Sequence, residues 1–204
     1  MSIRLSLITS IVGLTLSSVA FAQSPAGKPE RIRGDIVSFS DSTLTVHRRS
    51  GDDVSIKLSD KVPVNAVKTI QLSDIKPGSY VGTAAITGPD GKMTAREVLV
   101  FPAGARGTGE GHYAWDLGAN STMTNANVDT VVNSTNGRDL NLSYKGGSNT
   151  INVPSGVPVV TPVPATRDDL IKGKKVFVVA IPAQGGTYNA AAVVVEKDGV
   201  APPM

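Results

Sequence analysis

The sequence predicts an all-β fold of two small barrels in tandem, and three observations lead to this prediction. Short segments alternate apolar and polar residues, which is the pattern of half-buried strands. Clusters of Gly, Asp, Ser and Pro separate these segments and are typical of tight turns. The order of strands and turns in the first half of the chain then recurs in the second half.

The N-terminus has the features of a secretory signal peptide. Arg4 precedes an apolar run over residues 5–21, which ends in an A-x-A triplet. These features predict a signal peptide over residues 1–22, cleaved after Ala22. The alternative is a membrane anchor, for which the run is at the short end of the usual length. We therefore expect a periplasmic protein, secreted in a Gram-negative bacterium, with no membrane span after cleavage.

The chain contains no cysteine, which excludes disulfides, thiolate zinc sites and iron–sulfur clusters. A secreted protein without disulfides depends on the burial of apolar surface, which a mature chain of about 180 residues can supply. Residues 23–33 are rich in Pro, Gly, Lys and Arg, and we expect them to form a flexible leader.

The first repeat is expected over residues 34–102. Residues 89–92 read Pro-Asp-Gly-Lys, a strong turn sequence between two strands. Residues 72–75 suit a single helical turn because Pro-Gly follows shortly after. The expected strands are residues 35–39, 43–48, 54–58, 62–67, 80–87 and 93–101.

The second repeat is expected over residues 128–199, and residues 200–204 form a C-terminal tail. Its clearest match to the first repeat is the segment 167–176, which resembles 72–81 in having an acid, an apolar residue, Lys and Gly before a strand. Chance similarity is the alternative, but the matching order of five elements favours a tandem duplication. The expected strands are residues 128–132, 140–144, 150–153, 157–163, 175–181 and 188–196.

Five short strands with a helical turn before the last hairpin predict an OB-like β-barrel for each repeat. A β-sandwich built from both halves together is the alternative. Barrel closure removes exposed strand edges, which would otherwise favour aggregation of a strand-rich chain.

The Gly-rich segment 103–127, which joins the repeats, is the expected functional region. It holds the only Trp of the chain, and unusual residues in a loop on a rigid scaffold are often functional. The alternative is an ordered linker whose Tyr113 and Trp115 pack between the barrels. The candidate ligand-binding residues are Glu110, His112, Tyr113, Trp115 and Asp116.

A metal site is a second hypothesis for the same segment. His112, Glu110, Asp116 and Met123 offer nitrogen, oxygen and thioether donors, which suit zinc or copper. One His in the segment is few for such a site, and His47 is a further ligand only if the fold brings it near. No other cofactor is expected.

No enzymatic activity is expected from the sequence. The chain has two His and no Cys, and it lacks the G-x-G-x-x-G, G-K-[ST] and G-x-S-x-G motifs. The adjacent acids Asp52-Asp53 and Asp168-Asp169 lie in turn contexts, where neighbours point apart and do not share a proton. A formal net charge of +3 and few aromatic residues also argue against a nucleic-acid partner.

The chain resembles a family of small secreted bacterial proteins with OB-like β-barrel repeats, catalogued as a domain of unknown function. Segments 33–37, 44–46, 72–82 and 89–91 carry this resemblance, together with the Gly-rich joining segment. Members sometimes carry the label "metal ABC transporter permease", which this sequence does not support literally because it has no set of spanning helices. The resemblance implies fold and secretion, and the expected role is that of a binding or adaptor module for an envelope protein or a small ligand.

Overall fold

The structure is a computed structural model that describes residues 27–202. The predicted signal peptide, residues 23–26 of the predicted leader and the last two residues of the tail lie outside the described residues. Residues 30–33 of the leader are not loose, because they begin the first strand of a barrel.

The fold is all-β, as the sequence predicts. Within residues 27–202 there are thirteen strands and four short 3-10 turns. The turns are η1 (Leu72–Asp74), η2 (Ala103–Ala105), η3 (Arg167–Asp169) and η4 (Gln184–Gly186). The strands are β1 (Glu30–Ser40), β2 (Thr43–Arg48), β3 (Asp53–Lys57), β4 (Val64–Thr69), β5 (Tyr80–Thr87), β6 (Met93–Val100), β7 (Gly111–Ala114), β8 (Ser121–Ser134), β9 (Gly137–Tyr144), β10 (Gly147–Pro154), β11 (Val159–Pro164), β12 (Lys175–Pro182) and β13 (Tyr188–Val195).

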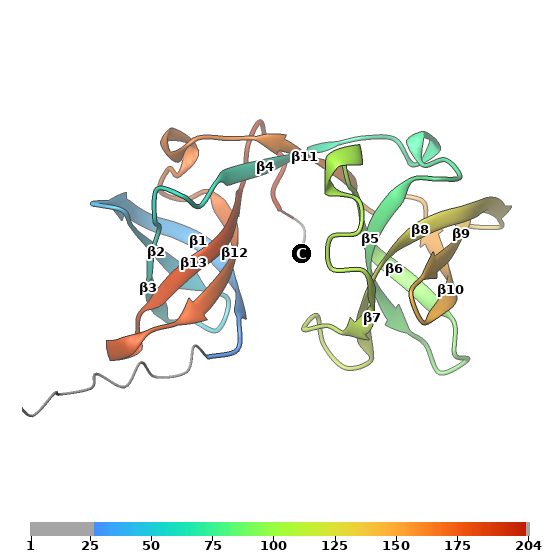
Figure 1. The fold of residues 1–204 in the computed structure, drawn as a ribbon, viewed down its shortest axis with the longest axis horizontal. Helices are drawn as coiled ribbons and strands as arrows, with labels where there is room; N and C mark the ends of the chain where they lie inside the picture. The colour runs from blue at the N-terminus through green and yellow to red at the C-terminus, as the bar shows by residue number, and fades with distance from the viewer. Residues whose placement is uncertain (1–26, 203–204) are drawn as a thin grey trace, which may run out of the picture.

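Two closed five-stranded barrels stand side by side (Figure 1). Barrel 1 closes in the order β1-β2-β3-β13-β12, and β12 pairs back onto β1. Barrel 2 closes in the matching order β8-β9-β10-β6-β5, and β5 pairs back onto β8. Each barrel is therefore of the OB-like kind, and the β-sandwich alternative is wrong.

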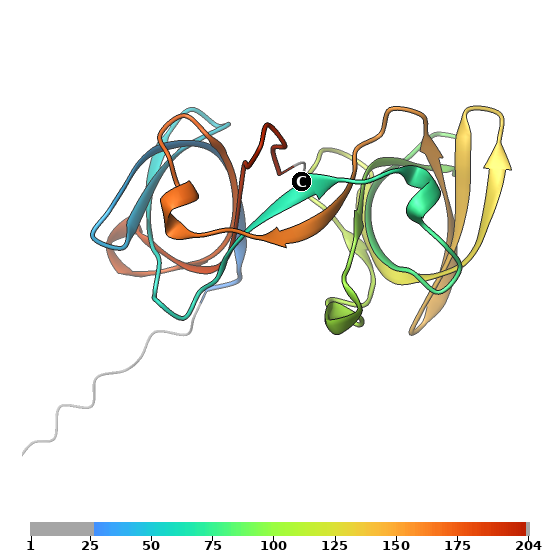
Figure 2. The same ribbon diagram turned by 90° about the horizontal axis from the view of Figure 1, so that it is seen from above.

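Each barrel contains strands from both sequence repeats. Barrel 1 takes β1–β3 from the first repeat and β12–β13 from the second, and barrel 2 takes the remaining halves. The assignment of residues 34–102 to one barrel and 128–199 to the other is therefore wrong. The physical reason is that β4 and β11 cross the middle of the molecule as an antiparallel pair (Figure 2). β4 takes the chain from barrel 1 to barrel 2, and β11 brings it back to barrel 1.

The strand registers match between the two barrels. Tyr188 lies opposite Ile56 in barrel 1 as Met93 lies opposite Ile151 in barrel 2. The bulge of β13 at residues 190–192 recurs in β6 at 95–97, and the β1 bulge at residues 36–38 recurs in β8 at 128–130. Bulges at equivalent positions support the predicted tandem duplication.

The turns η1 and η3 are also equivalent and confirm the predicted helical turns. In each, an acid at the third position accepts a hydrogen bond from the backbone N–H before the turn, at 2.9 Å for Asp74 and 2.9 Å for Asp169. Gly78 and Gly173 follow at φ of 85° and 86°, a conformation that strongly favours glycine. The shared acid and glycine of the sequence repeat therefore have a conformational basis.

Each barrel has its own apolar core, built from inward-facing residues of both repeats. Ile36, Leu44 and Ile56 of the first repeat pack with Val178 and Val193 of the second in barrel 1. Barrel 2 has the corresponding arrangement, in which Val81 and Val98 pack with residues of β8–β10. Burial of one such side chain contributes about 1.5–3 kcal/mol. Neither core is complete without both halves of the chain.

The predicted joining segment is only partly a linker. Residues 103–120 contain η2 and β7, but residues 121–127 begin β8 and pair with β5 in the wall of barrel 2. Within the described residues no helix is long and apolar enough to cross a membrane.

Because each barrel combines strands from both repeats, the fold predicts which engineered cysteines can form a disulfide. Lys57 of β3 lies opposite Asn189 of β13, and both side chains are exposed. In a barrel made from the first repeat alone, Lys57 would instead lie opposite Thr94 of β6, because Thr94 is the counterpart of Asn189 in barrel 2. The Lys57→Cys/Asn189→Cys variant is expected to form an intramolecular disulfide on mild oxidation, detected by mass and gel mobility.

The matched control is Lys57→Cys/Thr94→Cys, which carries the same first cysteine. It should remain reduced as a monomer, because its two cysteines lie in different barrels. Cross-linking of the control in place of the first pair would show that each repeat closes on itself.

Candidate functional site

The joining segment and the C-terminal residues lie between the two barrels (Figure 1). β7 pairs with β8 and thereby extends the wall of barrel 2. The residues after β7 then reach across to β1 of barrel 1. The predicted ligand-binding residues therefore lie at the junction of the barrels.

Asp116 joins the segment to barrel 1 through Arg33 of β1. The two guanidinium nitrogens donate to the two carboxylate oxygens at 2.8 and 2.9 Å. The Arg33 side chain is only 9% exposed, so this bidentate ion pair is partly desolvated. Such geometry is stronger and more specific than that of an exposed ion pair.

Trp115 packs against the same strand of barrel 1. The Arg31 guanidinium carbon lies 3.7 Å from the centre of the Trp115 ring, within the range of a cation–π contact. The Tyr113 ring packs beside Trp115, with 6.1 Å between ring centroids. Trp115 therefore has the structural role that the sequence offered as the alternative, a contact between the barrels.

His112 faces away from this contact. The register places His112 opposite Thr124 and Tyr113 opposite Met123, so His112 and Met123 project from opposite faces of the sheet. The His112 Nδ1 lies 2.8 Å from the Thr124 hydroxyl, and its ring stacks on Tyr144 at 6.2 Å. His112 thus lies against Tyr144 and remains exposed to solvent.

Glu110 and the glycines before it hold the loop against barrel 2. The backbone N–H of Lys145 donates to Glu110 at 2.9 Å. The side chain of Asn125 donates to the Thr108 carbonyl and to the Tyr113 hydroxyl, both at 3.2 Å. The loop is therefore fixed by side-chain contacts.

These contacts do not assemble the predicted metal site. Asp116 is paired with Arg33, Glu110 accepts from Lys145, and Met123 lies on the face opposite to His112. His47 of barrel 1 is bound to Asp53 at 2.6 Å. In the part of the chain that the structure describes, no three His, Cys, Asp or Glu side chains are grouped so that they could hold a metal ion.

A pocket of about 740 Å³ lies along β7 on the surface of barrel 2. His112, Tyr113 and Trp115 contribute to its wall, and Gly88 and Asn120 complete the rim. Tyr113 is 36% exposed, which makes it one of the few large apolar side chains accessible to solvent in the described chain. Three of the five predicted ligand-binding residues therefore share one accessible surface.

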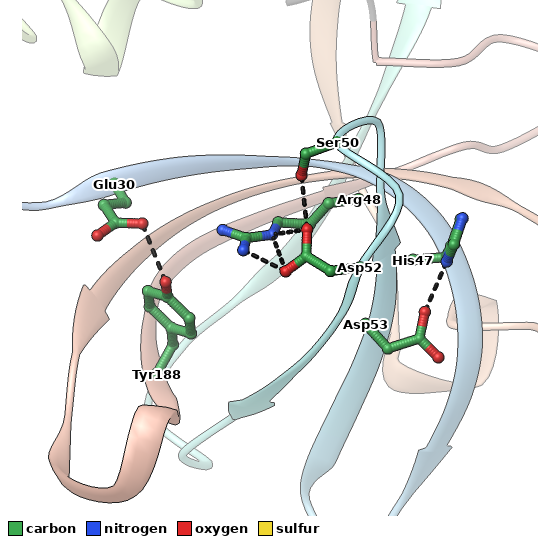
Figure 3. A network of polar contacts seen from close by, with 7 residues as sticks. All are labelled: Glu30, His47, Arg48, Ser50, Asp52, Asp53 and Tyr188. Atoms are coloured by element: carbon green, nitrogen blue, oxygen red, sulfur yellow. Dashed lines mark hydrogen bonds and ion pairs between the residues drawn. The ribbon is translucent and has the colours of Figure 1, made fainter.

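A polar network covers one end of barrel 1 (Figure 3). Asp52 accepts from Arg48 and from Ser50, and these contacts lower its pKa to about 2. Asp53 instead binds His47, so the two adjacent acids make separate contacts, as the sequence indicates. The Tyr188 hydroxyl donates to Glu30 at 3.0 Å.

Sequence reasoning missed Glu97, a buried acid on the face of β6 that points out of the barrel 2 core. Glu97 is 1% exposed, and neither of its carboxyl oxygens has a hydrogen-bond partner among residues 27–202. Burial raises the pKa of Glu97 to about 8, against the opposing effect of the positive charge of Arg33. Glu97 is therefore protonated at neutral pH.

The internal repeat contains a signal that could have identified this acid. The register makes Ala192 the counterpart of Glu97 in barrel 1, so the duplication contrasts a small apolar alanine, partly buried, with a glutamate that is buried. The basic partners Arg31 and Arg33 were missed because their segment reads as a leader.

The chain was compared with models of known protein families, with curated proteins and with solved structures, and none of them matches it.

The buried acid predicts a pH-dependent stability. The folded-state pKa of about 8 exceeds the ordinary value of 4.5, so the folded state holds a proton that the unfolded state releases. The stability that this proton provides is complete below pH 4.5 and is lost as the pH rises to about 8. Glu97→Gln, which stays neutral, should therefore gain about 2–4 kcal/mol over wild type by this upper pH.

Urea denaturation between pH 4 and 9 measures this difference. The control is Glu30→Gln, at an exposed carboxyl, whose difference from wild type should stay nearly constant. An unfolding free energy of Glu97→Gln that runs parallel to wild type at all pH values would contradict a buried, protonated Glu97.

Proposed function

We propose that this protein is a non-enzymatic binding module of the bacterial periplasm. It holds a small ligand or an envelope protein on the surface around β7, and the two barrels act as its scaffold. The observation that carries the proposal is the pocket along β7, where Tyr113 and His112 are accessible while Trp115 is anchored behind them.

The surface combines accessible aromatic area with a fixed backbone. The Asn125 side chain holds Tyr113 through its hydroxyl, and Arg31 holds Trp115 through its ring. A pre-ordered aromatic side chain loses little conformational entropy on binding, which favours affinity. The side chains of Thr87 and Asn120, which also line the pocket, can provide hydrogen bonds to a polar ligand.

The remaining features agree with binding rather than catalysis. The strongly perturbed acid, Glu97, is closed off from solvent and cannot contact a bound ligand in this conformation. The proposed periplasmic location rests on the signal-peptide pattern of residues 1–22, and we therefore expect the partner in the periplasm as well.

The proposal predicts that one face of the protein retains the ligand. The wild-type protein and the variant His112→Ala/Tyr113→Ala are each immobilised and exposed to a periplasmic extract of the bacterium that produces the protein. The ligand or envelope protein should be retained by wild type and reduced at least about tenfold in the variant, because the aromatic wall of the pocket is lost.

The control is Ile171→Ala, which removes an exposed apolar side chain near η3, away from β7. It should retain the ligand as wild type does. Equal retention by the double variant would contradict a binding surface at β7, and so would a matching loss in the Ile171→Ala control.

A further inference from the structure

Four arginines line one pocket between barrel 1 and the joining segment. Arg31 and Arg33 come from β1, Arg48 ends β2, and Arg49 follows in the turn. Asp116, Leu117 and Ser50 complete the wall of this arginine pocket, whose volume is about 440 Å³. Among the described residues, four arginines and one acid, Asp116, therefore line this space.

The strand register explains how the arginines gather. Arg31 and Arg33 are two positions apart on β1, so they project from the same face. The antiparallel pairing places Arg48 opposite Gly34, so its side chain leaves from the other face of the sheet, and Arg48 lines the pocket where β2 ends. The backbone N–H of Arg49 then donates to the carbonyl of Arg33 at 3.2 Å, which fixes the turn next to β1.

Only two of the four arginines are neutralised. Arg33 is paired with Asp116, and Arg48 is paired with Asp52. Within residues 27–202, neither Arg31 nor Arg49 forms an ion pair; Arg31 instead lies on the Trp115 ring. Like charges at such short range repel, and folding brings them together without enough carboxylates to offset the repulsion.

The site is also pre-ordered. The bidentate contact with Asp116 fixes Arg33, the Trp115 ring fixes Arg31, and Asp52 fixes Arg48. Planar guanidinium groups match the geometry of phosphate and other oxyanions, to which each donates two N–H groups. Arg49 is exposed, so it can move onto an incoming anion.

A second pocket of about 480 Å³ shares Arg33 and Arg49 with the first. Lys175 lies in its wall but is held by Asp35 at 2.5 Å, and the C-terminal residues 199–202 close the far side. Because the two pockets share these residues, a ligand whose anionic group lies in the arginine pocket can extend into the second pocket.

We propose that the arginine pocket binds an oxyanion with two or more negative charges, either free or as the phosphate group of a larger molecule. This site is distinct from the β7 surface, so it does not depend on the function proposed above. Its occupant offsets the repulsion among the guanidinium groups and joins barrel 1 to the joining segment.

Titration with inorganic pyrophosphate at low ionic strength tests the site. Calorimetry gives the affinity, and Trp115 emission should change because Arg31 lies on its ring. Arg49→Ala should weaken binding by about tenfold or more, because it removes a charge-assisted contact from an otherwise intact pocket. The affinity of Arg49→Lys, which keeps the charge but lacks the planar guanidinium group, should lie between those of wild type and Arg49→Ala.

The matched control is Arg96→Ala, which removes the same charge from an exposed position on β6 of barrel 2. It should change the affinity far less than Arg49→Ala does, because Arg96 does not line the pocket and acts on the anion only over a long distance. His112→Ala should also leave pyrophosphate binding unchanged, because His112 faces away from the Trp115 contact, and this separates the site from the β7 surface.

Two further outcomes identify the source of the anion. Co-sedimentation with phosphatidylcholine vesicles containing phosphatidic acid, if it is lost in Arg49→Ala and competed by pyrophosphate, assigns the site to a lipid headgroup. Binding of pyrophosphate without co-sedimentation assigns it to a soluble phosphate. Absence of binding in both arms overturns the proposal, as does equal weakening by Arg49→Ala and Arg96→Ala.

Discussion

The antiparallel pairing of β4 with β11 is the constraint on which the rest of the structure depends. These strands take the chain from one barrel to the other in opposite directions, so each barrel closes only with strands from both repeats. The same crossing places the outer face of β1 and the joining segment beside each other. Arg31 and Arg33 can therefore reach Trp115 and Asp116, and the arginine pocket forms between them.

The junction between the barrels combines strong contacts with groups that lack partners. Two nitrogens of Arg33 donate to Asp116, whereas its Nε has no hydrogen-bond partner in the described part of the chain. The positive charge of Arg33 acts on the buried Glu97. An unpaired buried carboxyl destabilises the folded state most when it is charged. The protein tolerates Glu97 because burial keeps it protonated, so the junction is more stable in acidic than in alkaline solution.

Much of the fold follows from local sequence, whereas the path between the barrels does not. Alternation predicts β1–β3 and β12–β13, and the acid and glycine of residues 72–78 predict the turn that precedes β5. Duplication hides the exchange, because the hairpin β12–β13 and its counterpart β5–β6 have the same apolar pattern and the same bulge. The lone Trp pointed to the segment that contacts both barrels, where Trp115 packs on Arg31. Its partner Arg31 was not foreseen because residues 23–33 lack clear alternation, and Glu97 was not foreseen because acids usually face solvent.

Cleavage within the joining segment tests the exchange of halves most directly. A protease site inserted between Gly107 and Gly109, in exposed backbone, would cut the chain into its two repeats. If the halves are interlocked, the cut protein elutes as one species of intact size, and its melting temperature falls on dilution because both barrels lose strands when the pieces part. Separation into two folded species of half size, without denaturant, would contradict the account.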